Sequence, residues 1–184
     1  NIKEFLHKKN FFIHHGDLLD SISIEKTIKK LKPDEIYNFA DQDHVRWSFE
    51  IPWYSFEVTA GAVVKILEII KNCSPHSKFF QPFTSNMYGN IAKKKLDEKE
   101  KFAPLSVYAL SKASAFYICE FYKNVFNLKI YGAIFFNHES ERRGKTFVTR
   151  KISVAVAKIM LGLQDSLSIG NLDAKRDWGY APEY

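Results

Sequence analysis

Apolar residues along the chain form short runs that alternate with longer stretches in which they recur every three or four positions. The short runs predict strands over residues 11–15, 35–40, 78–85, 129–136 and 167–170. Helical spacing predicts helices over residues 21–32, 52–73, 107–126 and 149–161. The first helix has Ser21 as its expected N-cap and is stopped by Pro33. Strands that alternate with helices favour an α/β fold with a doubly wound, Rossmann-type parallel sheet.

Two polar loops separate the later elements, a lysine-rich one over residues 86–106 and an arginine-bearing one over residues 138–144. Closely spaced glycines in the first strand-to-helix turn mark most dinucleotide-binding sheets. The eight glycines of this chain include no pair three or fewer residues apart. If the fold binds a nucleotide, its phosphate loop is therefore expected outside this sequence.

The composition narrows the class of protein. With 184 residues, 46% hydrophobic and 15% aromatic, the chain predicts a packed globule rather than a disordered segment. The net charge of +6 is scattered in short groups, which favours solvated faces over a nucleic-acid surface and suits an anionic small substrate. Cys73 and Cys119 have no metal-type spacing, so a reduced cytoplasmic protein without a metal site is expected. No apolar run approaches the roughly 20 residues of a membrane span.

Tyr108 and Lys112 stand four residues apart on a predicted helix, so they share one helix face. An ammonium one turn from a phenol stabilises the phenolate and suits proton transfer to or from a substrate hydroxyl. Such a pair is also common on exposed helix surfaces, and an ordinary solvated pair is the alternative interpretation.

Thr84 and Ser85 end a predicted strand, the edge at which open α/β sheets bind their ligands. A hydroxyl at this edge can share a substrate proton with Tyr108, whereas a simple cap on the strand end is the plainer alternative. The combination of Thr84, Tyr108 and Lys112 predicts a centre that oxidises and reduces a sugar.

The segments around these residues resemble a known family. TSNMYG followed by SVYALSK is similar to the extended short-chain dehydrogenases, which act on nucleotide sugars. The longer segments that resemble GDP-mannose 4,6-dehydratases are GDLLDS, PDEIYNFADQDHVRWSFE, FFNHESERRGKTFVTRKI and GNLDAKRDWGYAPEY. The resemblance implies a Rossmann-type domain over residues 1–137 that lacks its first βαβ with the glycine loop. It also implies the beginning of a substrate-binding region over residues 138–184, most of which is absent.

The resemblance implies an NADP cofactor, a GDP-sugar substrate, a homo-oligomer (dimer or tetramer) and a place in GDP-fucose biosynthesis. The cofactor contacts that it implies are Asp17, Leu18, Phe39, Ala40, Asp41, Gln42, Asp43, Tyr54, Lys112, His138 and Arg143. The substrate contacts that it implies are Asn137, Lys151 and Arg176. For Arg143 a solvated loop or a subunit contact is an alternative, and for Arg176 a structural pair with Asp177.

The reaction that the resemblance implies begins with hydride transfer from sugar C4 to NADP, assisted by Tyr108 and Thr84. A glutamate then removes the C5 proton and assists loss of the C6 hydroxyl as water, and hydride returns to C6. This chain has Asn86 at the position of that glutamate, and an amide cannot carry a proton at neutral pH. General acid–base catalysis contributes about 100- to 10,000-fold, so dehydration should be weakened.

Two further departures affect the cofactor loop and the strand before Thr84. Asp41 and Asp43 replace uncharged residues and should weaken NADP binding unless His44, Arg46 or protonation offsets their charge. Pro82-Phe83 replaces an Ala-Ser pair. Three hypotheses stay open: an active dehydratase with a base from elsewhere, an epimerase- or reductase-like enzyme, and a catalytically impaired homologue that only binds sugar nucleotide or pairs with an active subunit.

Overall fold

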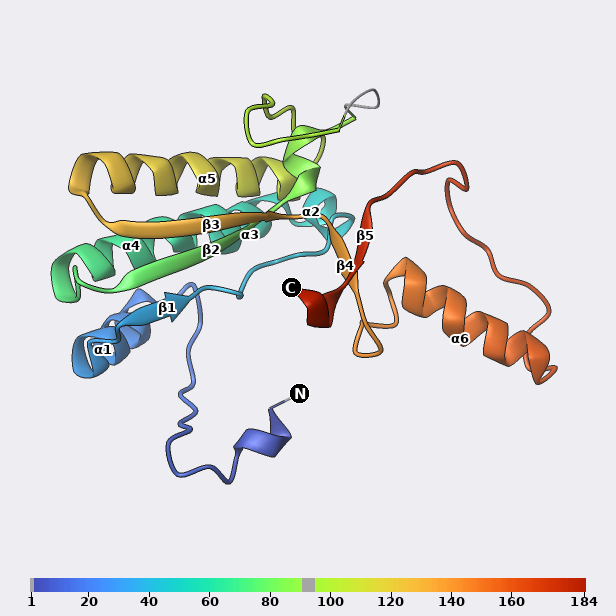
Figure 1. Cartoon of the computed structure of the whole chain (residues 1–184), viewed down its shortest axis with the longest axis horizontal. Helices are drawn as coiled ribbons and strands as arrows, with labels where there is room; N and C mark the ends of the chain where they lie inside the picture. The colour runs from blue at the N-terminus through green and yellow to red at the C-terminus, as the bar shows by residue number, and fades with distance from the viewer. Residues whose placement is uncertain (1, 91–94) are drawn as a thin grey trace. The chain divides into compact units, whose positions relative to one another are not determined.

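The computed structural model describes residues 2–90 and 95–184, so residues 91–94 of the lysine-rich loop lie outside the described part. The chain divides into two compact units, Asn1–Ile134 and Phe135–Tyr184. Figure 1 labels their elements along the chain. The first unit holds a parallel sheet with helices, which confirms the α/β fold class expected from the alternating pattern.

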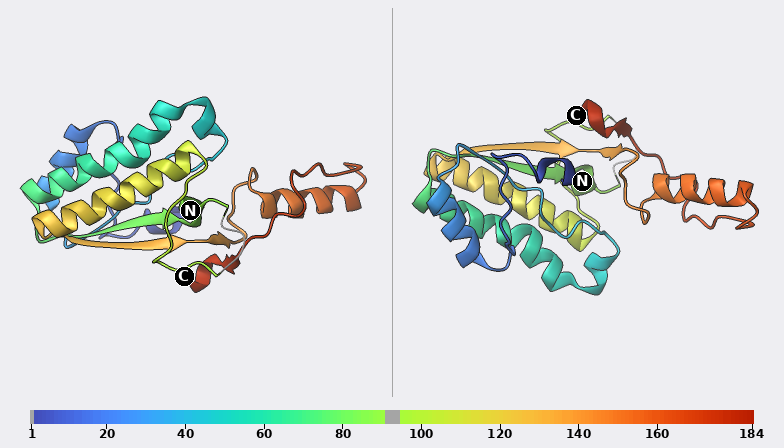
Figure 2. Two further views of the ribbon diagram at one scale, coloured as in Figure 1. Left: turned by 90° about the horizontal axis from the view of Figure 1, so that it is seen from above. Right: turned by 90° about the horizontal axis from the view of Figure 1, so that it is seen from below.

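The sheet of the first unit consists of β1 (Glu35–Tyr37), β2 (Lys78–Thr84) and β3 (Lys129–Phe135), in the order β1-β2-β3. β1 pairs with β2 in parallel, with Ile36 opposite Phe79. The long helices of this unit lie together on one face of the sheet (Figure 2). This layer is α1 (Ser21–Leu31), α4 (Ala62–Cys73) and α5 (Val107–Phe126).

The helix boundaries follow local capping chemistry. The carboxylate of Asp20 accepts hydrogen bonds from the backbone of Ile22 and Ser23, so Asp20 rather than the expected Ser21 caps α1. Lys32 then ends the helix in the left-handed region, at φ 43°. Three further short elements follow β1 or β2: α2 (Trp47–Glu50), α3 (Pro52–Phe56) and a 3-10 turn (Ser85–Tyr88).

The expected helix over residues 52–73 is interrupted by a π-helical stretch. α3 passes into this stretch at Glu57–Gly61, and α4 begins directly afterwards at Ala62. The apolar residues Val58, Ala62, Leu67 and Ile70 continue through this stretch, so the sequence pattern predicts one helix where the structure has three consecutive pieces.

The core of the first unit lies between the helix layer and the sheet. Val63, Leu67 and Ile70 of α4 are fully buried against Phe79 of β2. The ring of Phe83 meets the edge of Phe116 with 5.2 Å between centroids. On the neighbouring strand β3, a Cβ added to Gly132 would overlap the Phe83 ring, so that ring fills the space above the glycine.

The second unit contains β4 (Asn137–Glu139), α6 (Val148–Met160), β5 (Trp178–Tyr180) and a terminal 3-10 turn (Ala181–Glu183). β4 and β5 pair in parallel, with His138 opposite Gly179. The phenol of Tyr180 donates a hydrogen bond to Glu141 at 3.0 Å. The expectation of a loop over residues 138–144 is thus wrong at its start, where residues of the loop take part in β4.

Two predicted strands are wrong. Residues 11–15 have no strand conformation, and Phe12 and Ile13 are 75% and 55% exposed. Residues 167–170 are also irregular, and the Ser168 carbonyl accepts a hydrogen bond from the Lys151 side chain instead of a neighbouring strand. An apolar run forms a strand only when another strand supplies its hydrogen bonds, and a local pattern does not show that partner.

Candidate active site

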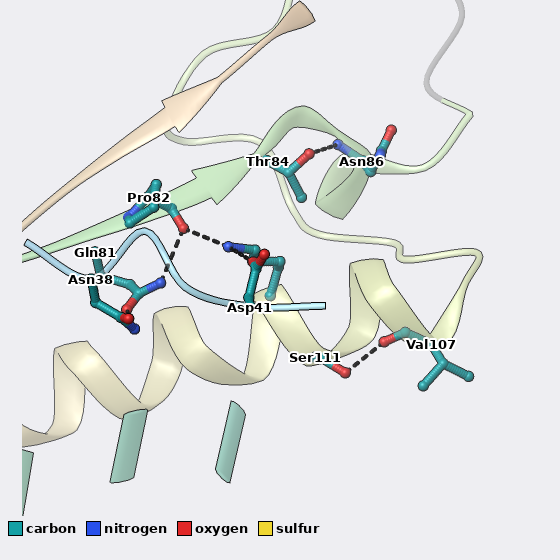
Figure 3. A network of polar contacts seen from close by, with 9 residues as sticks. Asn38, Asp41, Gln81, Pro82, Thr84, Asn86, Val107 and Ser111 are labelled. Atoms are coloured by element: carbon teal, nitrogen blue, oxygen red, sulfur yellow. Dashed lines mark hydrogen bonds and ion pairs between the residues drawn. The ribbon is translucent and has the colours of Figure 1, made fainter. Parts of the chain in front are cut away.

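Thr84 lies at the carboxyl end of β2, the edge at which the sequence predicted a ligand. Its hydroxyl accepts a hydrogen bond from the Asn86 backbone N–H at 3.3 Å and so caps the 3-10 turn Ser85–Tyr88. This capping contact, visible in Figure 3, agrees with the plainer interpretation of Thr84. A hydroxyl oxygen that accepts one bond still has a proton to donate. Thr84 therefore keeps a donor for a substrate oxygen.

The first turns of α5 bury the tyrosine and lysine that share a helix face. Ser106 caps the helix by accepting a hydrogen bond from the Ala109 N–H at 3.0 Å. Tyr108 is 9% exposed and Lys112 4% exposed. The Lys112 ammonium nitrogen lies 6.0 Å from the centroid of the Tyr108 ring. The interpretation as an ordinary solvated pair is therefore wrong.

Two oxygens hold the Lys112 ammonium. The Pro82 carbonyl accepts a hydrogen bond from Nζ at 3.0 Å, and the Asp41 carboxylate forms an ion pair with the same nitrogen. The lysine and aspartate side chains are only 5% and 12% exposed. A buried ammonium is costly unless it is paired and hydrogen-bonded, and these two oxygens meet that need. They join α5 to the end of β2 and to the loop after β1.

A buried amide pair supports the same carbonyl from the other side (Figure 3). Asn38 Nδ2 donates to Gln81 Oε1 at 2.9 Å, and Gln81 Nε2 donates to the Pro82 carbonyl at 3.2 Å. Asn38 is 8% exposed and Gln81 1%. Neither amide was predicted from the sequence as a residue of the site. Their signal was a polar residue in an inward position of an otherwise apolar run, in EIYNFA and in KFFQPF.

The charge opposite Asp41 comes from Lys112 and not from the residues expected to offset it. His44 stacks on Trp47 with 4.7 Å between ring centroids. Arg46 pairs with Glu50 at 3.3 Å, with side chains 83% and 58% exposed. His44 and Arg46, which the sequence offered as groups that could offset Asp41, each have a partner of their own on α2 instead.

The rest of the 39–43 segment divides into exposed and buried residues. Phe39, Ala40 and Asp43 are exposed, and the Phe39 ring lies 6.0 Å from that of Phe80. Gln42 is 8% exposed and donates from Nε2 to the His44 carbonyl at 3.1 Å. Its buried Oε1 has no hydrogen-bond partner within residues 2–90 and 95–184.

Three other expected cofactor residues of the first unit lie apart from this network. Asp17 is exposed and accepts a hydrogen bond from the Leu19 N–H at 2.8 Å. Leu18 packs against the core, and Tyr54 on α3 is 47% exposed. Within the described residues, no hydrogen bond or ion pair connects these three with Lys112.

Asn86 is exposed in the 3-10 turn that follows β2, two residues after Thr84, which caps this turn. Its side-chain amide can donate and accept hydrogen bonds but has no titratable group near neutral pH. The position is therefore accessible, and its chemistry is limited to hydrogen bonding.

The expected residues of the second unit make contacts within that unit. The Asn137 N–H donates to the Asp177 carbonyl at 3.2 Å, and His138 Nδ1 lies 3.0 Å from the Phe136 carbonyl oxygen. Arg143 pairs with Glu139 at 3.1 Å, and its guanidinium carbon lies 3.6 Å from the Phe147 ring centroid. Arg143 is thus half-buried and paired rather than a solvated loop residue.

Lys151 and Arg176 present exposed cationic side chains. Lys151 Nζ donates to the Ser168 carbonyl at 2.9 Å, and Arg176 donates to the neighbouring Lys175 carbonyl at 2.8 Å. Both keep further donors for an anionic ligand.

Two further properties of the described residues concern metal binding and membrane insertion. Within residues 2–90 and 95–184, no group of three or more His, Cys, Asp or Glu is arranged to hold a metal ion. In the same part of the chain, no helix has the length and apolar character needed to cross a membrane.

A parallel sheet whose second strand ends beside a buried tyrosine–lysine pair defines a Rossmann-type protein of the short-chain dehydrogenase class. The chain is similar in fold to the structure of RMD from Pseudomonas aeruginosa complexed with NADPH. That similarity has a TM-score of 0.82 and 24% identity, over 90% of this chain and 56% of the other.

The family is shown by sequence. The chain belongs to the GDP-mannose 4,6 dehydratase family, whose model matches residues 1–184. It is 44% identical over 177 residues to the GDP-mannose 4,6-dehydratase of Yersinia enterocolitica and, to the same extent, to the GDP-mannose 4,6 dehydratase of Homo sapiens. Each match covers 95% of this chain and 48% of the relative, so the chain spans about half the length of these proteins.

Proposed function

We propose that the protein carrying this chain is an NADP-dependent GDP-mannose 4,6-dehydratase, a lyase that forms GDP-4-keto-6-deoxymannose. The main support is the 3.0 Å hydrogen bond from Lys112 to the Pro82 carbonyl, which holds the tyrosine–lysine pair of α5 at the end of β2. Thr84 follows two residues later on the same strand. The relatives at 44% identity support the choice of reaction.

The groups at this edge fit a nicotinamide cofactor. Lys112 provides a buried charged donor and Thr84 a hydroxyl, and such groups bind the hydroxyls of a ribose. When bound, NADP would accept a hydride from the sugar and return it. The RMD structure with NADPH supports this assignment. The remaining positions that we propose to line the cofactor site are Asp17, Leu18, Phe39, Ala40, Asp41, Gln42, Asp43, Tyr54, His138 and Arg143, of which Asp41 and Asp43 bring negative charge that opposes an anionic cofactor.

The proposed roles of the chain's own residues follow from their chemistry. Tyr108 takes the proton of the sugar C4 hydroxyl as C4 becomes a ketone, and this proton later replaces the one lost at C5, because a phenol beside an ammonium can transfer a proton near neutral pH. Thr84 hydrogen-bonds the same hydroxyl, and Lys112 orients Tyr108. For the GDP-sugar we propose Asn137, Lys151 and Arg176 as ligands, since amide and cationic donors suit a diphosphate.

Asn86 favours a second candidate. An exposed amide at the position of the general base leaves oxidation and reduction at C4 possible without the loss of water. An epimerase- or reductase-like enzyme, or a homologue that only binds sugar nucleotide, is therefore the alternative to a dehydratase.

The deciding experiment incubates the full-length protein with GDP-mannose and NADP and identifies the product by mass spectrometry and NMR. A GDP-4-keto-6-deoxy sugar supports the dehydratase. A C4 epimer, or NADPH that accumulates without loss of water, supports the second candidate.

The same assay with Asn86→Glu tests whether the base is the limiting group. If it is, the variant should dehydrate the sugar about 100- to 10,000-fold faster than the unaltered protein. Asn90→Glu adds the same charge four residues later, at another exposed position, and serves as a control. Equal rates in all three proteins would show that Asn86 is not the defect.

We further propose a homo-oligomer, a dimer or tetramer, in which α5 contributes to the contact. The exposed residues Leu110, Tyr117, Phe121 and Val125 follow one another at helical spacing and form an apolar stripe. Light scattering of Phe121→Glu should show a smaller particle than that of the unaltered protein.

The unpaired thiols of Cys73 and Cys119 support a cytoplasmic location. We keep residues 1–137 as the dinucleotide-binding part, residues 138–184 as the start of the substrate region, and a role in GDP-fucose biosynthesis as parts of this proposal.

A further inference from the structure

Asp41 gives the Lys112 ammonium a negative partner inside the protein. The ion pair is almost closed to solvent, and the ammonium also donates to the Pro82 carbonyl at 3.0 Å. An ammonium has three N–H donors, so these two oxygens leave at most one for a ligand. The N–H of Lys112 that points to the Asp41 carboxylate is therefore not available to a ligand.

We propose that Asp41 competes with the nicotinamide cofactor for Lys112 and so lowers the affinity of the protein for NADP(H). This inference rests on the proposed function, because it takes Lys112 as a cofactor contact. A ribose hydroxyl is neutral and accepts more weakly than a carboxylate, so it must share the ammonium or displace Asp41. The carboxylate also adds negative charge beside an anionic dinucleotide.

The position of Asp41 in the fold suits an internal competitor. It lies in the irregular segment between β1 and α2, where small backbone changes can move a side chain. The start of this segment is fixed, because Asn38 is hydrogen-bonded to Gln81 at 2.9 Å. The neighbours Ala40 and Asp43 face solvent, whereas the Asp41 carboxylate turns inward to Lys112.

Two effects of opposite sign follow from removing the carboxylate. The free protein should lose stability, because a buried ammonium without its anion is unfavourable. The affinity for NADPH should rise, since the fraction of molecules with an available Lys112 increases and the apparent affinity follows that fraction. A purely structural role for Asp41 predicts that stability and affinity fall together.

The test measures NADPH binding by isothermal titration calorimetry on the full-length protein, with thermal unfolding in the absence and presence of NADPH. The variant is Asp41→Ala, and Asp41→Asn is a second variant that keeps an oxygen for Lys112. Asp34→Ala is the matched control, because it removes the same charge from an exposed position before β1 that has no proposed role in the site. None of these measurements depends on turnover of a sugar.

We expect Asp41→Ala to bind NADPH on the order of tenfold more tightly and to unfold at a lower temperature without ligand. Asp41→Asn should change in the same direction to a smaller extent. Asp34→Ala should change binding about twofold or less, because an exposed charge is screened.

Three results would overturn the inference. Equal effects of the Asp41→Ala and Asp34→Ala variants would assign the change to net charge alone. Unchanged or weaker binding in both Asp41 variants, while the unaltered protein binds NADPH, would reject the competition and leave the proposed function intact. Absence of NADPH binding in every protein would reject both the competition and the cofactor of the proposed function.

Discussion

Each end of helix α5 places a tyrosine with a lysine and a carboxylate, but the order of the groups is reversed. At the carboxyl end, Tyr122 donates to Glu68 at 2.7 Å, and Lys71 lies beyond that carboxylate, also at 2.7 Å. At the amino end the lysine is next to the tyrosine, and the carboxylate of Asp41 lies beyond the lysine.

The order determines what each tyrosine can do. Burial, and then the hydrogen bond to Glu68, raises the pKa of Tyr122 to about 12, so this phenol keeps its proton and acts as a structural donor. A cation next to a phenol instead favours the release of its proton. The same three residue types thus build a structural contact at one end of α5 and a candidate catalytic pair at the other.

The sharpest test of this contrast removes one phenol oxygen at a time. Tyr108→Phe should lower turnover of GDP-mannose by about 100- to 10,000-fold, because the proposed acid–base group is lost. Tyr122→Phe should keep turnover within about twofold, since its phenol makes no contribution to proton transfer. Both rates are measured from product formed by the full-length protein. Comparable losses in the two variants would contradict the assignment.

The second test compares the two lysines. Lys112→Met leaves the half-buried Asp41 without its cation and should lower the free energy of unfolding by about 3–5 kcal/mol. Lys71→Met removes a partner from Glu68 where both side chains are partly exposed, 28% and 40%, so a clearly smaller loss is expected. Urea unfolding monitored by circular dichroism gives both values. Equal losses in the free energy of unfolding would show that burial does not make the Lys112–Asp41 pair more important for stability than the Lys71–Glu68 pair.

The smallest expected effect concerns alkaline pH. The folded protein holds the Tyr122 proton more tightly than the unfolded chain, whose tyrosine has the ordinary pKa of 10.0. The resulting stabilisation is complete below pH 10 and is lost as the pH rises to about 12. Urea midpoints across this range should therefore fall more steeply for the unaltered protein than for Tyr122→Phe.

Other groups also titrate at alkaline pH, so the difference between the two proteins is the informative quantity. Burial raises the pKa of the Cys119 thiol to about 12 and also raises that of Tyr88. Both remain in Tyr122→Phe, so their contributions cancel. If the urea midpoints of the two proteins fell in parallel with rising pH, the proton of Tyr122 would not contribute to stability.

Local chemistry explains which parts of the fold could be read from the sequence. α5 spans Val107–Phe126 as predicted, because the Ser106 cap and the apolar periodicity are both encoded within the segment. The predicted strand at residues 11–15 is wrong for the opposite reason, since strand pairing depends on residues elsewhere in the chain. The end of β1 at Tyr37 shows the same limit, because the last contacts with β2 come from Asn38, whose N–H donates to the Phe80 carbonyl at 3.0 Å and whose amide donates to Gln81 at 2.9 Å.

The candidate site divides in the same way. Thr84, Tyr108 and Lys112 could be identified because their spacing carries a recognisable chemistry. The partner of Lys112 could not, since Asp41 meets it only when the loop after β1 folds against α5. His44 and Arg46 could be named as possible partners of Asp41 only because they are close in sequence, whereas a tertiary contact pairs Asp41 with Lys112.

The close packing of Phe83 over Gly132 couples these two positions of neighbouring strands. Because a side chain at 132 would overlap the ring, a larger residue there requires the Phe83 ring to move. Residues in such contact are not energetically independent. The effects of substitutions at 83 and 132 on stability should therefore not add, and the two positions behave as one unit in a mutational analysis.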